Sequence, residues 1–293
     1  MTLHQQPLQL NSQLQSVLSS EAAEFLATGQ RYELPGRMIW HAWGADTAPT
    51  ILLLHGGSGS WTHWIRNIQP LVAEGYRVLA VDLPGFGDSD VPANGGDADA
   101  LVEPLHAAWQ LLRQHDNNIL MGFSFGGMTA ALWSAQYPQD AQTLVMVGAP
   151  GFGLASPKRI PLKGWRHLAT EALQVQAHRH NLMGLMLHDE ANLDEVAMRL
   201  HVLNVVRDRM TRRRLSSTPV LVEAMPKIKC PVHVIYGEFD AFYLDRLPEV
   251  ETMFKQVTPN LVLWQLVKGM GHWVQYENPT GFHRALKHTL SLV

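Results

Sequence analysis

Short apolar runs recur along the chain, and segments with helically spaced apolar residues separate them. Continuous apolar runs are typical of strands that are covered on both faces, as in parallel sheets. Helical patterns fall at about 61–73, 98–115 and 126–137, and residues 37–43 suggest an early antiparallel hairpin strand. The sequence therefore predicts an α/β fold with a mostly parallel central sheet flanked by helices. The apolar runs cover residues 51–54, 76–81, 118–121, 143–147, 231–237 and 261–267.

The alternation of strand and helix patterns stops after residue 150. Residues 151–218 contain no strand candidate, only helical periodicity, for example at 165–180 and 193–210. Strand and helix patterns resume in 219–293. We therefore expect a helical cap, or lid, of residues 151–218 inserted into an α/β core made of residues 31–150 and 219–293.

Residues 1–30 differ from the rest of the chain, because they are rich in Gln, Ser and Leu. Leu10, Leu14, Leu18 and Phe25 are spaced roughly as one stripe on a helix. This pattern predicts an N-terminal helical extension that packs on the domain or on a second subunit, with disorder as the alternative. A homodimer is therefore compatible with the sequence but not required by it.

Composition narrows the class of protein. With 293 residues and 46% hydrophobic content, the chain can bury one large core. A net charge of −3 gives no electrostatic reason to expect nucleic acid or an acidic membrane as a partner. The single cysteine, Cys230, excludes an internal disulfide and fits a reducing cytoplasm. The first residues lack a signal-peptide pattern and no apolar stretch is long enough to span a membrane, so we expect a cytoplasmic protein.

The pentapeptide Gly122-Phe123-Ser124-Phe125-Gly126 carries the clearest chemical signal. It is a G-x-S-x-G sequence at the end of an apolar run and the start of a helical pattern. A strand that turns sharply into a helix exposes a serine hydroxyl at a strained elbow, and the following N–H can face a developing oxyanion. Ser124 is thus the candidate nucleophile, and Phe125 supplies a candidate oxyanion donor.

The remaining groups of a serine triad follow in the expected order. Asp240 comes just after the 231–237 strand pattern, and His272 follows the 261–267 pattern. Functional groups of parallel α/β sheets gather at the carboxyl ends of strands. Glu238 and Asp245 are alternative acids, but Asp240 is favoured because it lies three residues past Gly237, the end of the strand pattern. His272 is the predicted general base and Asp240 the group that orients it.

A glycine-rich turn upstream completes the candidate machinery. Residues 51–54 end at His55-Gly56-Gly57-Ser58-Gly59, and such a turn suits a second oxyanion donor. The Gly57 N–H is the expected donor beside that of Phe125. Spare histidines show no third ligand at metal spacing, so we expect neither a metal nor a cofactor.

These motifs, together with residues 82–89 after the 76–81 strand, closely resemble those of the α/β-hydrolase superfamily over residues 30 to 293. Residues 272–279 also resemble the His-Trp-x-x-x-Glu stretch of the meta-cleavage-product hydrolases, which cleave a carbon–carbon bond in vinylogous 1,5-diketones. That group has Asn and Met around its nucleophile, where this chain has Phe123 and Phe125. Its cap arginine has no unambiguous counterpart here. Arg199 is nearest, and Arg207 or Arg209 could serve instead.

Aromatic and apolar residues near the predicted mouth indicate a small hydrophobic substrate. The basic run at 207–214 is best explained as a solvated helix end with ion pairs, and attraction of an anionic substrate is the alternative. We expect Trp273, Phe123, Ser58, Arg199 and Arg207 to contact substrate. The favoured function is a serine-dependent hydrolase of a carboxylic ester. The alternatives are a C–C bond hydrolase of ring-cleavage products and a hydrolase-fold binding protein with little turnover.

Overall fold

One twisted sheet dominates the computed structural model, which describes residues 4–92, 96–154, 161–210 and 212–291. Within these residues the sheet has nine strands, in the order β1-β2-β3-β5-β4-β6-β7-β8-β9. The strands are β1 (His4–Pro7), β2 (Gln30–Leu34), β3 (Met38–Trp43), β4 (Thr50–Leu54), β5 (Arg77–Asp82), β6 (Asn118–Phe123), β7 (Thr143–Val147), β8 (Val232–Gly237) and β9 (Leu261–Val267).

The strand order creates the place where a site can form. β1, β2 and β3 pair antiparallel, whereas β4 to β9 run parallel to one another. β4 lies between β5 and β6, so the order reverses there. Ligands of open α/β sheets bind outside the carboxyl ends of the strands at such a reversal. The predicted α/β fold with a mostly parallel sheet is confirmed.

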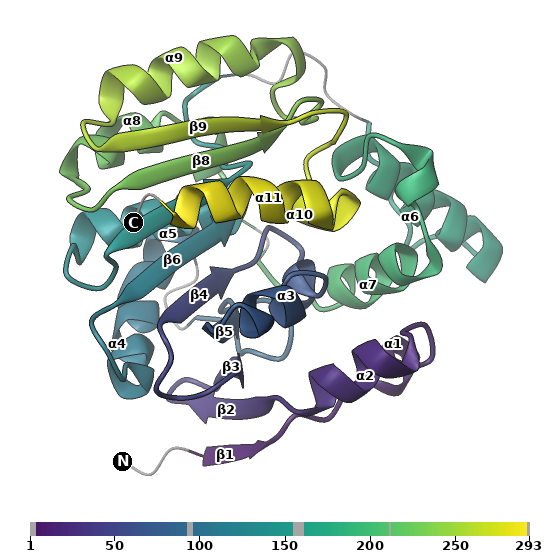
Figure 1. Cartoon of the computed structure of the whole chain (residues 1–293). Helices are drawn as coiled ribbons and strands as arrows, with labels where there is room; N and C mark the ends of the chain where they lie inside the picture. The colour runs from purple at the N-terminus through teal and green to yellow at the C-terminus, as the bar shows by residue number, and fades with distance from the viewer. Residues whose placement is uncertain (1–3, 93–95, 155–160, 211, 292–293) are drawn as a thin grey trace.

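Helices cover both faces of the sheet (Figure 1). In β4, Leu52 and Leu54 pack with residues of α4, α5, α8 and α9, while Ile51 and Leu53 pack with residues of α3 and α11. Two buried faces explain why the strands read as continuous apolar runs. The helices are α1 (Ser12–Gln15), α2 (Ser20–Ala27), α3 (Ile68–Ala73), α4 (Val102–Leu112), α5 (Phe125–Gln136), α6 (Glu171–Leu185), α7 (Glu195–Val205), α8 (Val220–Ala224), α9 (Leu247–Val257), α10 (Val274–Glu277) and α11 (Pro279–Leu290).

Short 3-10 turns replace parts of the expected helices. The 61–73 pattern is divided into the turn η1 (Trp61–Trp64) and α3, and the 98–115 pattern into η2 (Ala98–Leu101) and α4. In the 165–180 pattern the helix α6 begins only at Glu171, where the hydroxyl of Thr170 accepts a hydrogen bond from the Leu173 N–H and caps the helix.

The segment 151–218, called the cap segment below, contributes α6, α7 and the short turns η3 (Glu190–Asn192) and η4 (Leu215–Ser217) in its described residues. It contributes no strand to the sheet in those residues. In Figure 1 the helices α6 and α7 lie beside the sheet, next to the end where β8 and β9 point. Leu182 of α6 and Leu200 of α7 are buried in the same cluster as Phe123 and Trp273.

The sequence predicts a helical N-terminal extension, but the structure shows that this extension also contains a strand. His4–Pro7 pair antiparallel with β2 as strand β1, and Gln30 already belongs to β2. Backbone pairing at an open sheet edge needs no apolar side chains, so a hydrophobic stripe gives no sign of it. Leu14 and Leu26 pack into the core of this same chain. Residues 1–3 lie outside the described part.

No helix in the described residues is long and apolar enough to cross a membrane.

Candidate active site

Ser124 lies at a sharp turn between β6 and α5. Its backbone has φ 52° and ψ −117°, and its N–H donates to the Val147 carbonyl at 2.7 Å. A non-glycine residue with positive φ is strained, and such strain concentrates at functional sites. A Cβ on Gly122 would lie 2.2 Å from the Gly126 oxygen, and one on Gly126 would lie 2.4 Å from the His55 oxygen. Both glycines of the pentapeptide are therefore required for the tight turn.

Asp240 and His272 form a buried pair at the same edge of the sheet. The Nδ1–H of His272 donates to Asp240 Oδ2 at 2.7 Å, and the other carboxylate oxygen accepts from the Phe242 N–H at 3.0 Å. The side chains are 1% and 0% exposed. This contact leaves Nε2 of His272 as the nitrogen that can take up a proton. The alternative acid Glu238 instead accepts from the Gly269 N–H.

Aromatic rings and a glycine fix the imidazole. The ring centroids of Phe123 and Phe242 lie 4.9 and 4.6 Å from that of His272. Gly148, at the end of β7, has a φ of +58°, and a Cβ there would lie 3.0 Å from His272 Cε1. Sequence reasoning missed Gly148. Its only signal was the position of a Gly-Ala-Pro-Gly run directly after a strand.

Ser124 and His272 flank Gly148, but the described residues show no hydrogen bond between these two side chains. The nucleophile is fixed through Val147, and the imidazole approaches Gly148, the next residue along the chain. Hydrogen bonds between catalytic groups often tighten only when substrate is bound. Asp240 and His272 are thus in direct contact, and Ser124 lies at the same edge of the sheet.

Two buried histidines support the loop of residues 55–60, which is called the oxyanion loop below because it contains the predicted donor Gly57. The Leu83 N–H donates to His55 Nε2 at 2.9 Å, so Nδ1 carries the proton and donates to the Gly56 carbonyl at 2.7 Å. The Gly56 N–H donates to His63 Nδ1 at 3.2 Å. Burial lowers the pKa of His55 to about 4 and that of His63 well below its usual value. Both rings are therefore neutral at pH 7 and hold the loop in place through their hydrogen bonds.

The two predicted oxyanion donors lie on neighbouring backbone segments. A Cβ on Gly57 would lie 3.8 Å from Phe125 Cβ, and a Cβ on Gly56 would lie 3.2 Å from Ser124 Cβ. Phe125 is the first residue of α5, so the helix offers its N–H no carbonyl partner. The positive end of the helix dipole lies at the same point and favours negative charge there.

A buried carboxylate links the His272 loop to the cap segment. Glu277 accepts from the Gly271 N–H at 2.5 Å, and from the N–H groups of His188 and Asp189 at 2.7 Å each. The Trp273 N–H also donates to the Met186 carbonyl at 2.7 Å. The position of the cap segment is therefore tied to the backbone on both sides of His272.

The predicted substrate contacts are placed in different surroundings. Phe123 and Trp273 are 0% and 1% exposed, and the Trp273 indole N–H donates to the His63 carbonyl. Both rings serve as packing beneath the loops, because adjacent rings and backbone cover them. Arg199 lines a pocket between α6 and α7. Arg207 pairs with Asp88 at 2.8 Å and lines a different cavity, beside the N-terminal segment.

Arg209, the other arginine considered, donates to the carbonyls of Gly87 and Ser89. The arginine nearest the oxyanion loop is instead Arg213, which the sequence showed only as part of a basic run. Its Nη1 would lie 3.0 Å from a Cβ on Gly57, and this nitrogen is buried without a hydrogen-bond partner among the described residues.

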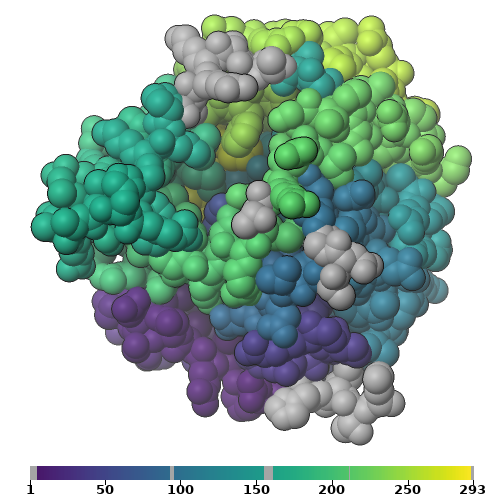
Figure 2. All heavy atoms as spheres, turned by 180° about the vertical axis from the view of Figure 1, so that it is seen from behind, coloured from purple at the N-terminus to yellow at the C-terminus, as the bar shows by residue number. Residues whose placement is uncertain are grey.

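Arg213 is held by two neighbours. Its Nη2 donates to Asp208 Oδ2 at 2.9 Å and to Ser58 Oγ at 3.2 Å, and the Ser58 hydroxyl donates to Asp208 at 2.5 Å. These three side chains line a hollow of about 710 Å³ between the oxyanion loop and the cap segment. Figure 2 shows a hollow between the teal cap residues and the green residues that follow α7. The lining mixes apolar side chains such as Trp165 and Met210 with cationic ones.

Within the residues that the structure describes, no group of three or more His, Cys, Asp or Glu side chains is placed to hold a metal ion. The lone Cys230 is buried, and burial raises the pKa of its thiol to about 11. A thiol with so high a pKa is a weak nucleophile at neutral pH.

Comparison with known proteins agrees with this geometry. Residues 49–214 match the family model described as the alpha/beta hydrolase fold. A protein of Cupriavidus pinatubonensis, named 2-hydroxy-6-oxononadienedioate/2-hydroxy-6-oxononatrienedioate hydrolase, is 29% identical over 81% of this chain and 85% of its own length. A protein of the same name from Escherichia coli K12 is 25% identical over 83% and 87%. The predicted similarity to C–C bond hydrolases is confirmed.

Solved structures of esterases share the fold. A carboxylesterase from Bacillus subtilis superposes with a TM-score of 0.71 at 17% identity, covering 95% of this chain and 97% of that one. An esterase from a Rhodococcus species gives a TM-score of 0.69 at 22% identity, covering 87% and 94%.

Proposed function

Since this chain belongs to the α/β-hydrolase fold family, we propose that it cleaves small hydrophobic carboxylic esters with Ser124 as the nucleophile. The protein is an enzyme of the hydrolase class. The observation that carries the proposal is the buried pair of Asp240 and His272, 2.7 Å apart, at the sheet edge where Ser124 is held at positive φ. No metal or organic cofactor takes part in the proposed reaction.

In the first half of the reaction, Ser124 Oγ attacks the ester carbonyl carbon while His272 Nε2 takes the hydroxyl proton. The carbonyl π electrons move to the oxygen, and the N–H groups of Gly57 and Phe125 bind the resulting oxyanion. One such donor is worth about 3–4 kcal/mol of transition-state stabilisation in related chemistry. Asp240 holds Nδ1–H and stabilises the imidazolium.

When the tetrahedral intermediate collapses, the bond to the alkoxy group breaks and His272 gives its proton to the leaving oxygen. A water molecule then attacks the acyl group on Ser124, with His272 again accepting the proton. The second collapse returns the proton to Ser124 Oγ and releases the carboxylic acid. The hollow beside Ser58, with its apolar and cationic lining, supports a small substrate with an apolar body.

The proposal is tested by measuring kcat/KM for p-nitrophenyl butyrate and for a vinylogous 1,5-diketone ring-fission product, with wild type and Ser124→Ala. We expect a preference for the ester and a loss of at least about a thousandfold in Ser124→Ala. Unchanged rates in that variant would exclude the mechanism. Negligible turnover of both substrates by the wild type would favour a hydrolase-fold binding protein.

Hydrolysis of a C–C bond is the second candidate, and Arg213 is the observation that favours it. The names of the relatives describe dienedioates, which carry two carboxylates. Here a guanidinium nitrogen without a partner lies beside Gly57 of the oxyanion loop. A substrate carboxylate would pair with Nη1 while Asp208 and Ser58 hold the other side of the fork.

Recognition of the anion can be separated from the type of bond. Mono-p-nitrophenyl adipate carries a carboxylate that p-nitrophenyl butyrate lacks. We expect Arg213→Gln to lower kcat/KM for the adipate ester by about 10- to 100-fold, the usual value of a charged hydrogen bond. The butyrate ester should change by less than about twofold, because no charge pairs with Arg213. Equal losses for both esters would mean that Arg213 only supports the loop.

A further inference from the structure

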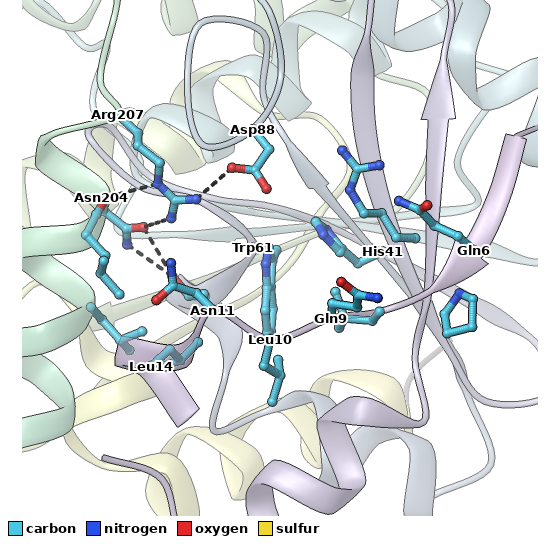
Figure 3. Close-up of a pocket in the computed structure, with 16 residues that line it drawn as sticks. Gln6, Gln9, Leu10, Asn11, Leu14, His41, Trp61, Asp88, Asn204 and Arg207 are labelled. Carbon is cyan, nitrogen blue, oxygen red and sulfur yellow. Dashed lines mark hydrogen bonds and ion pairs between the residues drawn. The ribbon is translucent and has the colours of Figure 1, made fainter. Parts of the chain in front are cut away.

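A second cavity lies away from the triad, between the N-terminal segment and helix α7 (Figure 3). Its volume is about 330 Å³, at the lower end of small-molecule pockets. Its walls come from the chain between β1 and α1, from β2 and β3, from η1 and from α7 with the residues that follow it. It shares no lining residue with the hollow beside Ser58, and Ser124, Asp240 and His272 do not line it either, so it is a separate compartment.

The charged groups of this cavity favour an anion. Arg31 and Arg207 are its two cationic side chains and Asp88 its one carboxylate, which leaves one net positive charge. Asp88 already pairs with Arg207 at 2.8 Å. The partner of Arg31 is Glu33, which lies 3.5 Å away and is 41% exposed. Arg31 itself is only 15% exposed, so an anion inside the cavity would be a less hydrated partner than Glu33.

His41 adds an unfilled hydrogen-bonding group to the wall. It is 2% exposed, and its Nδ1 is buried without a hydrogen-bond partner among the described residues. Burial lowers the pKa of His41, so the ring is neutral at pH 7 and can donate or accept one hydrogen bond. In Figure 3 the ring points toward Trp61, and the two ring centroids lie 5.3 Å apart. Buried polar atoms without partners are rare in proteins, which marks this wall as fit for a ligand.

The rest of the cavity suits an apolar, flat body. The Trp61 indole stands in the middle of Figure 3, and Leu10 and Leu14 also line the cavity. Leu200 and Leu203 of α7 add aliphatic surface. An indole face packs well against another planar ring. Asn204, which also lines the cavity, is already bonded to Ser60 and Thr62, so its amide is a fixed wall.

We propose that this cavity is a second binding site, independent of the triad, for a small carboxylate with an aromatic or other flat apolar body. The carboxylate pairs with Arg31 and hydrogen-bonds near His41, while the body packs between Trp61 and the leucines of the N-terminal segment and α7. The N-terminal extension thereby acquires a role beyond adding a strand, since it closes one wall of the site.

Binding of 4-fluorobenzoate, followed by ligand-observed fluorine NMR, tests the proposal on the full-length protein. We expect saturable binding with a dissociation constant of about 1 mM or below, as suits a ligand of this size. The neutral 4-fluorobenzamide should bind at least about tenfold more weakly. The Arg31→Gln variant should weaken benzoate binding by a similar factor, and Arg31→Lys, which keeps the charge, by less. Circular dichroism confirms that both variants are folded.

Arg179→Gln, at an arginine that is 49% exposed and pairs with Glu190, is the matched control and should leave the dissociation constant unchanged. Arg213→Gln, which removes the cation beside Gly57, tests whether the anion binds there instead. If Arg213→Gln weakens binding and Arg31→Gln does not, the anion binds in the hollow beside Ser58 and the proposal is wrong. Equal affinity for the benzamide would overturn the anionic class of ligand. Absence of saturation would mean that the cavity holds only solvent.

Discussion

The loops at the strand ends and the cap segment both carry charged side chains, but they hold them by different means. Ser124, Asp240 and His272 are fixed by the backbone itself, through positive φ, a tight turn and a glycine without a side chain. Arg207 and Arg213 of the cap segment are instead held by carboxylates, those of Asp88 and Asp208. In the proposed function, the first arrangement positions the reacting groups, which requires exact geometry. The second would set a preference for substrate, which requires only a charge within reach.

The largest expected effect comes from removing the negative charge of Asp240, in the loops at the strand ends. Asp240→Asn should lower kcat/KM for p-nitrophenyl butyrate by about 10⁴, because an amide N–H would face Nδ1 and favour the wrong tautomer of His272. Glu238→Gln is the control, since glutamine keeps an oxygen for the Gly269 N–H. It should change kcat/KM by less than about threefold. Similar losses in the two variants would contradict the assignment of the acid.

The loops at the strand ends can be predicted from the sequence, whereas the cap-segment arginine proposed to bind a substrate carboxylate cannot. The triad residues each follow an apolar run, and strand ends of a parallel sheet converge, so their order along the chain is informative. The sequence offers no reason to prefer Arg213 to Arg199, Arg207 or Arg209. A long side chain on an irregular segment can reach in several directions. The cavity proposed as a second binding site could not be predicted, because β1, with the sequence HQQP, has no apolar pattern that indicates a strand there.

Replacing each of two glycines, Gly148 and Gly75, by alanine adds a single methyl group and sharpens the comparison. Gly148→Ala should lower kcat/KM by about 10²-fold, because the new Cβ lies 3.0 Å from His272 Cε1 and must displace the imidazole. Gly75→Ala is the control. Gly75 also has positive φ, at +90°, but a Cβ there meets nothing within 4 Å. Both variants should lose about 1–2 kcal/mol of stability from backbone strain, and only Gly148→Ala should lose activity in steady-state assays.

Glu277 is where the two regions meet, so its replacement should affect both. Glutamine has one acceptor oxygen for the N–H groups of Gly271, His188 and Asp189, and its amide would face at least one of these donors. We expect Glu277→Gln to lower the free energy of unfolding by about 1–3 kcal/mol and kcat/KM by about tenfold, as His272 shifts with Gly271. Denaturant titration and steady-state kinetics measure the two effects.

Glu249 is an exposed residue of α9 that pairs with Arg246, the residue just before that helix, and it offers a matched control. Glu249→Gln should change neither the melting temperature nor kcat/KM. If Glu277→Gln lowers stability but leaves kcat/KM at the wild-type value, the carboxylate anchors the cap segment without positioning His272.

The smallest expected effect is a loss of folding stability at acid pH, which should arise from His55 in the loops at the strand ends and not from the arginines of the cap segment. Arginines do not titrate in this range, whereas His55 is held neutral beneath the oxyanion loop with a pKa lowered by burial from 6.5 to about 4. The unfolded chain binds a proton on this ring below about pH 6.5 and the folded chain does not, so stability is lost as the pH falls from 6.5 toward 4. Protonation of Nε2 would also break the hydrogen bond from the Leu83 N–H.

Between about pH 7 and about pH 5 this one group should cost about 2 kcal/mol of unfolding free energy. Urea titrations at both pH values, with wild type and His55→Gln, measure it. The variant is less stable at neutral pH, because it loses at least one of the two hydrogen bonds of the ring. Its further loss on acidification should be smaller than that of the wild type by this amount. The other buried histidines remain in both proteins and cancel in the difference. An equal loss in the two proteins would show that His55 is already charged or already solvated in the folded state, and the oxyanion loop would then lack the neutral imidazole inferred here.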